Sequence, residues 1–314
     1  MKILPIYNAH SLQNNNQAIK KGNEKLNSNF AQYSNFTKIP CNYFSNINFT
    51  SSNVQIIDKM EKIVSSKKYS FDELEKLFKE MTQKAQDNVT GVVEKFGDEG
   101  LTVEKYIPAC VIQPQLFCQS PDTIESNVRD LVKKFEKEGL TVESYLPACV
   151  KQPPLFCQSP DTIESNVRDL VKKFAKEGLT VKKYLPACFK EPSLFAYSPD
   201  TIAEHIRAYQ YVDKNRNGDG NIEKALKKKL TLSTSAIYLR EIIRPQIKAQ
   251  CLSLSNLNVD GIKPRLKKYF EENPNAQFKI KVIKDKMTDS FIETMQEYCE
   301  KDLGKPDAFI FEIK

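Results

Sequence analysis

The 314-residue sequence predicts a mainly α protein: an α-solenoid of 39-residue helix-pair repeats, with a small C-terminal α+β unit and a disordered N-terminus. The first observation is a duplication, because residues 101–139 and 140–178 differ at five of 39 positions and a third copy begins at Leu179. The second is that each copy carries an amphipathic helix, which cannot bury its apolar stripe alone. Self-similarity at such a period is typical of stacked helical repeats. We therefore expect three parts, at residues 1–53, 54–250 and 251–314.

The chain before the repeats divides into two stretches. Residues 1–53 are rich in Asn, Ser and Gln, a composition typical of disorder. From Val54 to about Ala85 the pattern becomes helical. Ser70 precedes the second of two helices, and Glu73 three positions later predicts a capping box. We expect this helix pair to close the N-terminal end of the array.

The first helix of each repeat contains a conflict. In the second copy it follows Thr141, a candidate N-cap, but Pro147 lies inside it, and Pro108 and Pro186 repeat the feature. An interior proline costs a helix about 3 kcal/mol. Two interpretations stay open: the helix is kinked in every repeat, or it begins later.

The second helix of each repeat has a full set of start and stop signals. In Ser159–Gly178, Ser159 suits the N-cap and Pro160 suits the first helical position, where its missing N–H costs nothing. Gly178 supplies a left-handed residue that ends the helix. The apolar positions follow the spacing of one helix face: Ile163, Val167, Leu170, Val171 and Phe174.

The motifs of the repeat resemble those of the mitochondrial transcription termination factor (mTERF) repeat. The shared residues are the P-x-L-F of Pro153, Leu155 and Phe156, the helix start at Ser159, the apolar Ile163, Val167 and Leu170, and the Gly178-Leu179-Thr180 that opens the next unit. The resemblance covers about residues 83–202. It implies a curved α-solenoid of helix pairs that binds nucleic acid.

The run DKNRNGDGNIEKAL follows the third long helix and invites an EF-hand interpretation. Asp213 occupies loop position 1, but position 12 is Lys224 instead of the bidentate glutamate that calcium needs. We therefore favour a turn rich in Asn and Gly.

Residues 221–250 are basic and helical. Two helices joined by a polar turn could form a helix-turn-helix, with Ser233 or Ser235 as the N-cap and Arg240, Arg244 and Lys248 on the second helix. The alternative is a C-terminal cap with a solvated charged face.

The last part of the chain has the pattern of a small α+β unit. We expect a helix at 264–272, an alternating strand at 278–283, a helix at 289–303 stopped by Gly304, and a second strand at 308–313.

Catalytic signatures are absent from the sequence. It has no glycine-rich phosphate loop, no G-x-S-x-G and no H-E-x-x-H, so we expect no enzyme, no cofactor and no small-molecule substrate. A metal site is not expected either, since there are two histidines and no C-x-x-C. Of the eight cysteines, five follow the 39-residue period, which indicates small apolar residues in a reducing compartment.

The positive charge of the chain lies mostly after the two clearest repeats. Residues 101–178 have ten Lys and Arg against eleven Asp and Glu, whereas residues 201–250 have ten against five. The repeated helix nevertheless carries a cationic stripe at i, i+4 and i+8, namely Arg129, Lys133 and Lys137, and again Arg168, Lys172 and Lys176. Stacked helices would align such stripes into a ladder for a phosphate backbone. The alternative is ordinary surface pairing, because Glu164 precedes Arg168 by four and Asp169 precedes Lys173 by four.

These observations favour a non-enzymatic binding protein. The first hypothesis is nucleic-acid binding along the solenoid groove, and the alternative is a protein-interaction scaffold or effector that grips a peptide or helix. The candidate nucleic-acid contacts are Arg129, Lys133, Lys137, Arg168, Lys172, Lys176, Arg207, Lys227, Lys228, Lys229, Arg240 and Arg244. No apolar run is long enough to span a membrane, and no signal peptide is evident, so we expect a cytoplasmic protein, with export by a signal-independent route left open.

Overall fold

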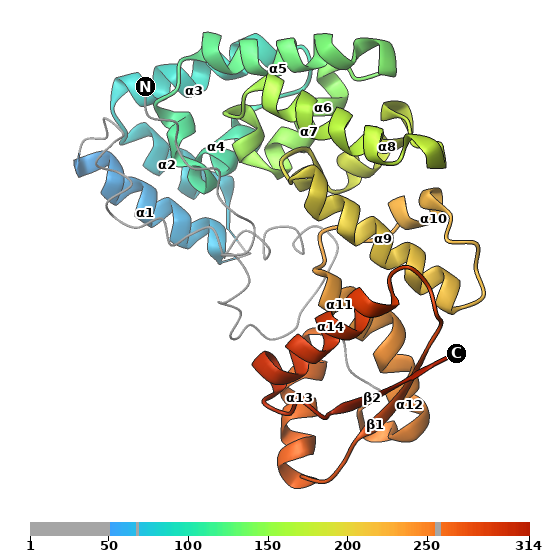
Figure 1. Ribbon diagram of the computed structural model, residues 1–314. Helices are drawn as coiled ribbons and strands as arrows, with labels where there is room; N and C mark the ends of the chain where they lie inside the picture. Colours follow the sequence, from blue (N-terminus) through green and yellow to red (C-terminus); the bar gives the residue numbers. More distant parts are fainter. Residues whose placement is uncertain (1–50, 67–68, 255–258) are drawn as a thin grey trace, which may run out of the picture. The chain divides into compact units, whose positions relative to one another are not determined.

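The computed structural model describes residues 51–66, 69–254 and 259–314, and these are mainly helical with a small two-stranded sheet (Figure 1). The predicted disorder of residues 1–53 lies outside this part of the chain, except that Ser51–Asn53 begin the first helix. The chain forms two compact units. The first comprises residues up to Asn166 together with Cys188–Tyr197, and the second comprises Val167–Ala187 and Ser198–Lys314.

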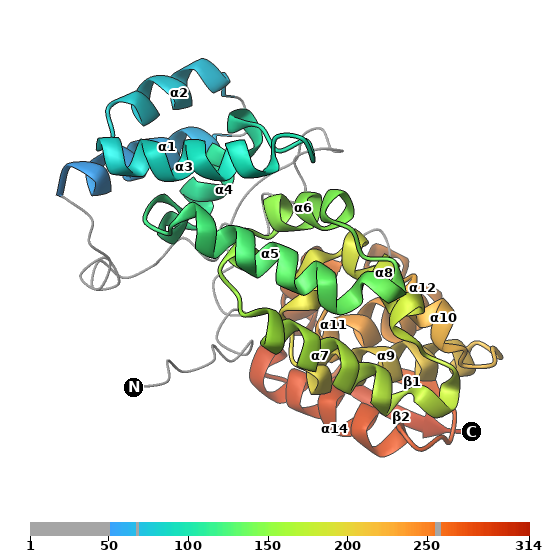
Figure 2. The same cartoon turned by 90° about the horizontal axis from the view of Figure 1, so that it is seen from above.

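The first unit opens with three helices: α1 (Ser51–Ser65), α2 (Phe71–Lys79) and α3 (Gln83–Phe96). α1 contacts α2, and both contact the helix that follows α3. Figure 2 shows these four helices as one group. The predicted N-cap at Ser70 is confirmed, since its side chain accepts from the Asp72 amide at 3.2 Å. The predicted capping box is not formed, because within the described residues the Glu73 side chain makes no hydrogen bond to the Ser70 amide. Instead, Asn53 exchanges two hydrogen bonds with Thr82, at 3.0 and 3.1 Å, and ties α1 to the start of α3.

The first helix of the repeat runs through its proline. It appears as α4 (Val103–Ile112) and α6 (Val142–Lys151), and each begins directly after its threonine. The interpretation in which the helix begins later is therefore wrong. Pro147 lacks the N–H that would bond the Glu143 carbonyl, so the helix loses one internal bond and continues.

The P-x-L-F motif forms a short 3₁₀ turn that fills the space between helices. The turns are η4 (Pro114–Phe117) and η6 (Pro153–Phe156), and their Leu and Phe side chains are buried. In each case an asparagine of the preceding long helix donates to the turn's last carbonyl. Asn88 bonds the Phe117 oxygen at 2.9 Å, and Asn127 bonds the Phe156 oxygen at 3.0 Å. This repeated bond joins one copy of the repeat to the next.

The second helix of the repeat is α5 (Pro121–Phe135), and its equivalent α7 covers Pro160–Lys173. The serine N-cap is confirmed at Ser120, whose side chain accepts from the Thr123 amide. The last turn is not α-helical. It is a 3₁₀ turn, η5 (Glu136–Glu138) or η7 (Ala175–Glu177), which ends at a glycine in the predicted left-handed conformation, with φ of 94° at Gly139 and 80° at Gly178.

The second unit contains the end of the repeats and the C-terminal elements. After α8 (Val181–Lys190), which spans the unit boundary, and the turn η8 (Pro192–Phe195), it continues with α9 (Pro199–Asn215). The later helices are α10 (Ile222–Leu226), α11 (Thr234–Tyr238), α12 (Arg244–Gln250), α13 (Val259–Glu272) and α14 (Thr288–Tyr298). The predicted Asn/Gly-rich turn after α9 is present, with positive φ at Asn217 and Gly220.

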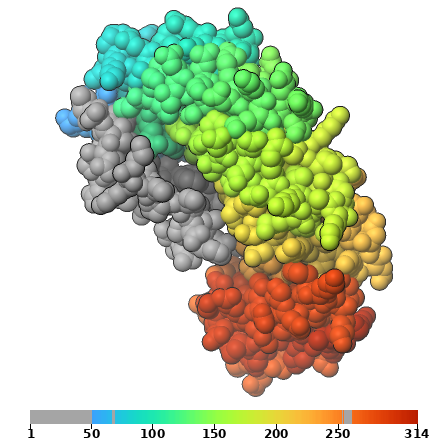
Figure 3. Space-filling view, turned by 45° about the horizontal axis from the view of Figure 1, so that its top comes forward, coloured from blue at the N-terminus to red at the C-terminus, as the bar shows by residue number. Residues whose placement is uncertain are grey.

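The two predicted strands form one parallel pair, β1 (Phe278–Val282) and β2 (Phe309–Ile313), with α14 between them in the chain. The second predicted helix of this region ends early, because α14 passes into a π-turn (Cys299–Leu303) before Gly304 stops it. In the space-filling view the C-terminal residues, coloured red, gather into one mass (Figure 3). They share a core with α9 and α11, since Phe291 contacts Tyr211 at 5.5 Å and Tyr238 at 4.7 Å between ring centroids.

Candidate nucleic-acid interface

Ion pairs from lysines outside the predicted cationic ladder join successive long helices. In the first unit, Lys95 on α3 pairs with Asp122 at 2.8 Å and with Glu125 at 2.6 Å, both on α5. One period later Lys134 pairs with Asp161 at 2.8 Å and with Glu164 at 2.7 Å. The pKa of the Glu125 carboxyl is lowered, chiefly by its hydrogen bond from Lys95 and next by a hydrogen bond from Arg129. The lysines therefore join copies of the repeat, and the predicted pairing to an acid four residues earlier does not apply to them.

Arg129 is the most strongly engaged of the predicted contacts. Its Nη1 pairs with Glu99 at 3.0 Å, its Nε pairs with Glu125 at 2.9 Å, and its Nη2 donates to the Lys95 carbonyl at 3.1 Å. Its guanidinium also lies 5.2 Å from the centre of the Phe96 ring. The pair with Glu125 is the i, i+4 surface pair expected as the alternative. Arg129 is thus engaged by two carboxylates within the protein, which leaves fewer of its donors open to a ligand.

Arg207 occupies the same repeat position in the second unit but has different neighbours. The position of Glu125 is taken by Ala203, and the position of Glu99 by Glu177, whose carboxylate accepts from Gln210 at 2.5 Å. No described carboxylate forms an ion pair with Arg207, although its charge helps to lower the pKa of Asp200, after the larger effect of Lys173. The guanidinium still lies over an aromatic ring, 5.8 Å from the centre of Phe174. Its fork of donors is therefore held in place by the ring and open to a ligand.

The remaining lysines of the stripe do not form one continuous row. Lys133 and Lys172 lie on exposed helix positions and make no ion pair within the described residues. Lys137 and Lys176 are also exposed, but they lie in the 3₁₀ turns beyond the helix ends. The expected i, i+8 alignment is therefore wrong, because Phe135 and Phe174 leave α-helical geometry before the glycine stop. For Arg168 the structure supports only that its side chain is exposed.

The helix-turn-helix interpretation of residues 221–250 is wrong. The first helix has only five residues, and the second is interrupted by a π-turn (Leu239–Ile243). Ser233 is the N-cap, as predicted.

Arg240 is engaged within the protein. It pairs with Glu241 and donates to the Tyr209 hydroxyl, both at 2.8 Å. Burial raises the pKa of Glu241, but the bonds and charges of Arg240 and Arg216 outweigh it, so that the net shift is downward. The Arg240 guanidinium therefore already has partners within the protein. Lys227, Lys228 and Lys229 follow α10 and are exposed.

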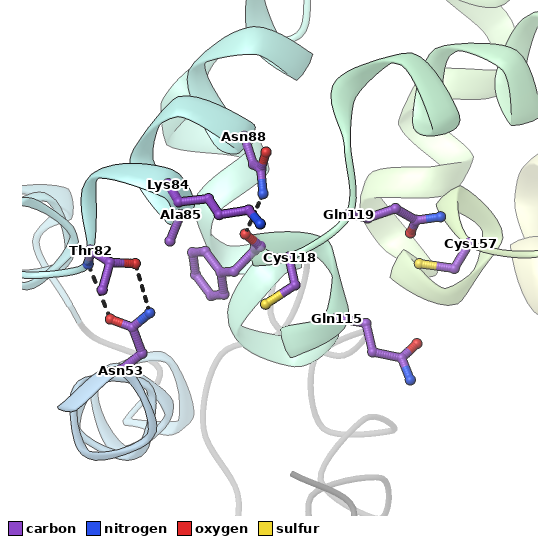
Figure 4. Close-up of a pocket in the computed structure, with 10 residues that line it drawn as sticks. Asn53, Thr82, Lys84, Ala85, Asn88, Gln115, Cys118, Gln119 and Cys157 are labelled. Atoms are coloured by element: carbon purple, nitrogen blue, oxygen red, sulfur yellow. Dashed lines mark hydrogen bonds between the residues drawn. The ribbon is translucent and has the colours of Figure 1, made fainter. Parts of the chain in front are cut away.

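An open pocket lies in the first unit, with a volume of about 460 Å³ (Figure 4). Asn53 and Asn88 on its wall are already bonded to Thr82 and to the Phe117 carbonyl. Burial raises the pKa of the Cys118 thiol, and the ammonium of the exposed Lys84 offsets part of that rise. The other polar groups on the pocket wall are Gln115, Gln119 and Cys157. Sequence analysis did not find this pocket, because it forms between α1, α3 and the turn η4.

The periodic cysteines behave as predicted apolar residues. Cys110, Cys149 and Cys188 are buried, and burial raises the pKa of Cys157 to about 12. The cysteines of the described residues form no disulfide with one another, and those residues hold no cluster of metal-ligating side chains. In the turn after α9, Lys224 pairs with Asp219 at 2.9 Å and lies 3.6 Å from Asp213, so a cation already fills that place.

Comparison with known proteins gives no relative. No family model, no curated protein and no solved structure matches the chain. No described helix is long and apolar enough to cross a membrane. The resemblance to the mTERF repeat therefore stays a prediction from the motifs.

Proposed function

We propose that the chain is a non-enzymatic α-solenoid protein that binds nucleic acid. The contacts are those of the predicted cations for which the described residues show no ion pair: Arg207, Lys133, Lys137, Lys172, Lys176, Lys228 and Lys229. The observation that carries the proposal is the change at Arg207, where the repeat keeps the arginine and its aromatic support but replaces Glu125 with Ala203 and turns the second carboxylate, Glu177, to Gln210. An arginine with an open fork suits phosphate oxygens, which it can bind with two parallel bonds.

The charge distribution supports the same region. The excess of positive charge lies in residues 201–250, ten Lys and Arg against five Asp and Glu, and Arg207 lies within it. Binding through phosphates does not depend on base sequence and weakens steeply with salt. We therefore expect binding to both random DNA and random RNA, with single strands included in the comparison.

The test is a salt titration of the full chain against fluorescent duplex and single-stranded DNA and RNA. Micromolar binding at about 50 mM salt with a steep negative slope of log K against log salt supports the proposal. Absence of binding to all four probes at that salt refutes it.

A protein ligand is the second candidate, and the pocket of Figure 4 favours it. Side-chain amides at Gln115 and Gln119 and the ammonium of Lys84 can hydrogen-bond the backbone and carboxylate of a peptide. The matched variants Lys84→Ala and Arg207→Ala separate the two candidates. Loss of a bound peptide with Lys84→Ala, and not with Arg207→Ala, favours the protein ligand.

A further inference from the structure

The two outer edges of the C-terminal sheet differ in whether side chains bond their peptide groups. At the outer edge of β1, the side-chain amide of Gln246 donates to the Lys281 carbonyl at 2.9 Å and accepts from the Lys281 amide at 2.7 Å. Gln250 does the same for Lys279, at 2.8 and 3.3 Å. The side chains of α12 therefore satisfy the peptide groups that an added strand would need, and this edge is closed.

The outer edge of β2 has no such cover within the described residues. The ladder to β1 uses alternate residues, since the Phe278 amide bonds the Ala308 carbonyl and the Lys314 amide bonds the Val282 carbonyl. Phe309, Phe311 and Ile313 consequently direct their N–H and C=O groups away from β1. The sheet has two strands, and no described side chain bonds these groups.

The same strand carries exposed apolar side chains. The large hydrophobic residues that are exposed in the described part of the chain are Leu252, Ile310 and Ile313, and the last two lie on β2 at 41% and 53% exposure. An open strand edge with exposed isoleucines is a template for pairing with another strand. Because β1 is closed and β2 is open, pairing would add to one side of the sheet only.

We propose that β2 pairs antiparallel with β2 of a second copy of this chain, to form a four-stranded sheet across a two-fold axis. Charge selects the register. Placing Phe311 opposite Ile313 would set Glu312 opposite Glu312, and like charges directly opposite are destabilising. Placing Phe311 opposite Phe311 would set Glu312 against Ile310.

A third register places Glu312 opposite neither Glu312 nor Ile310 of the second copy. With Phe309 opposite Phe311, Ile310 lies opposite Ile310 of the second copy, in the closely spaced type of pair, and Glu312 lies opposite Ala308. Glu312 also keeps its partner on its own chain, since Lys279 lies 3.9 Å away. In this register β2 is complementary to a second copy of β2, because the two Ile310 side chains meet at the two-fold axis and the two Glu312 side chains lie apart.

The test is analytical ultracentrifugation of the full chain at about 500 mM salt, where phosphate binding is screened but apolar strand pairing is not. We expect a dimer for the wild type and a monomer for Ile310→Lys at concentrations up to about 100 µM, because a charge at the axis opposes its own copy. Leu252→Lys is the matched control, since it removes another exposed apolar side chain for the same charge, and it should stay dimeric.

Hydrogen exchange gives an independent measurement. In the dimer the Phe309 and Phe311 amides should exchange more slowly as the protein concentration rises, and in Ile310→Lys they should not. Circular dichroism of Ile310→Lys should match the wild type, because the side chain faces solvent. A wild type that stays monomeric at high salt, an Ile310→Lys variant that is still dimeric, or equal loss in Leu252→Lys overturns the proposal. The nucleic-acid proposal is unaffected by any of these results.

Discussion

Arg129 and Arg207 stand at the same repeat position, two periods apart, and differ in what surrounds them. Both guanidinium groups lie over a phenylalanine of the preceding copy, at 5.2 and 5.8 Å. Arg129 has two carboxylate partners, whereas Arg207 has none within the described residues. The aromatic support is therefore common to both copies of the repeat, and the neighbouring carboxylates decide whether the arginine forms ion pairs within the protein. The nucleic-acid proposal depends on this difference.

The largest expected effect comes from charge reversal at Arg207. We expect Arg207→Glu to weaken binding to nucleic acid about tenfold or more, because it removes a phosphate contact and adds repulsion, and Arg207→Ala to reduce the salt slope by about 1. Fluorescence anisotropy across a salt series measures both. Binding that is unchanged in Arg207→Glu contradicts the assignment of this residue.

The matched change at Arg129 should act on stability. Arg129→Ala leaves Glu99 and Glu125 without their partner, but the arginine is 41% exposed and solvent screens the pairs. We therefore expect a loss of about 1 kcal/mol in the free energy of unfolding, measured with urea, and nucleic-acid affinity within about twofold of wild type. A loss of affinity as large as that of Arg207→Glu would mean that the ion pairs do not distinguish the two positions.

The sequence predicts the architecture of the repeat better than the use of its charges. Helix starts at serine and stops at Gly139 and Gly178 follow from local backbone preferences, so they were predictable. The pairing of Lys134 with Asp161 and Glu164 was not, because the spacing of 27 and 30 residues between partners has no local signature. The replacement of Glu125 by Ala203 was visible in the alignment of copies. The effect of this replacement on Arg207 follows only from the ion pair between Arg129 and Glu125, which the structure shows.

The C-terminal unit shows the same limit. Alternation predicted both strands to within about a residue at each end, since period 2 is a local property. Their parallel pairing, and the closure of β1 by Gln246 and Gln250, depend on contacts 29 to 35 residues apart in the chain. The open edge of β2 could not be found without them.

A carboxylate restored at position 203 should convert the second environment into the first. In Ala203→Glu the new side chain lies four residues before Arg207, as Glu125 does before Arg129, so it should pair with the guanidinium. We expect affinity for nucleic acid to fall about threefold, less than in Arg207→Glu. Because Ala203 is only 2% exposed, the longer side chain also has to displace its neighbours, so we expect the free energy of unfolding to fall by about 1 kcal/mol or more. Ala203→Gln, which lacks the charge, is the control and should bind within error of wild type. If Ala203→Glu and Ala203→Gln bind equally, the missing acid does not explain the proposed site.

The smallest expected effect is a difference in acid sensitivity between wild type and Arg129→Ala. The pKa of Glu125 is lowered in the folded protein, by hydrogen bonds from Lys95 and then from Arg129. A lowered folded pKa stabilises the protein above the unfolded pKa of about 4.3, and that stabilisation is lost as the pH falls through the folded value. Removing Arg129 removes part of the shift, so the gap in melting temperature between the two proteins should be full at roughly pH 6 and should narrow toward pH 3. Arg207→Ala, which has no carboxylate partner to release, should show no such narrowing. A gap for Arg129→Ala that stays constant with pH would mean that its cost comes from lost contact with Phe96 and not from the ion pairs.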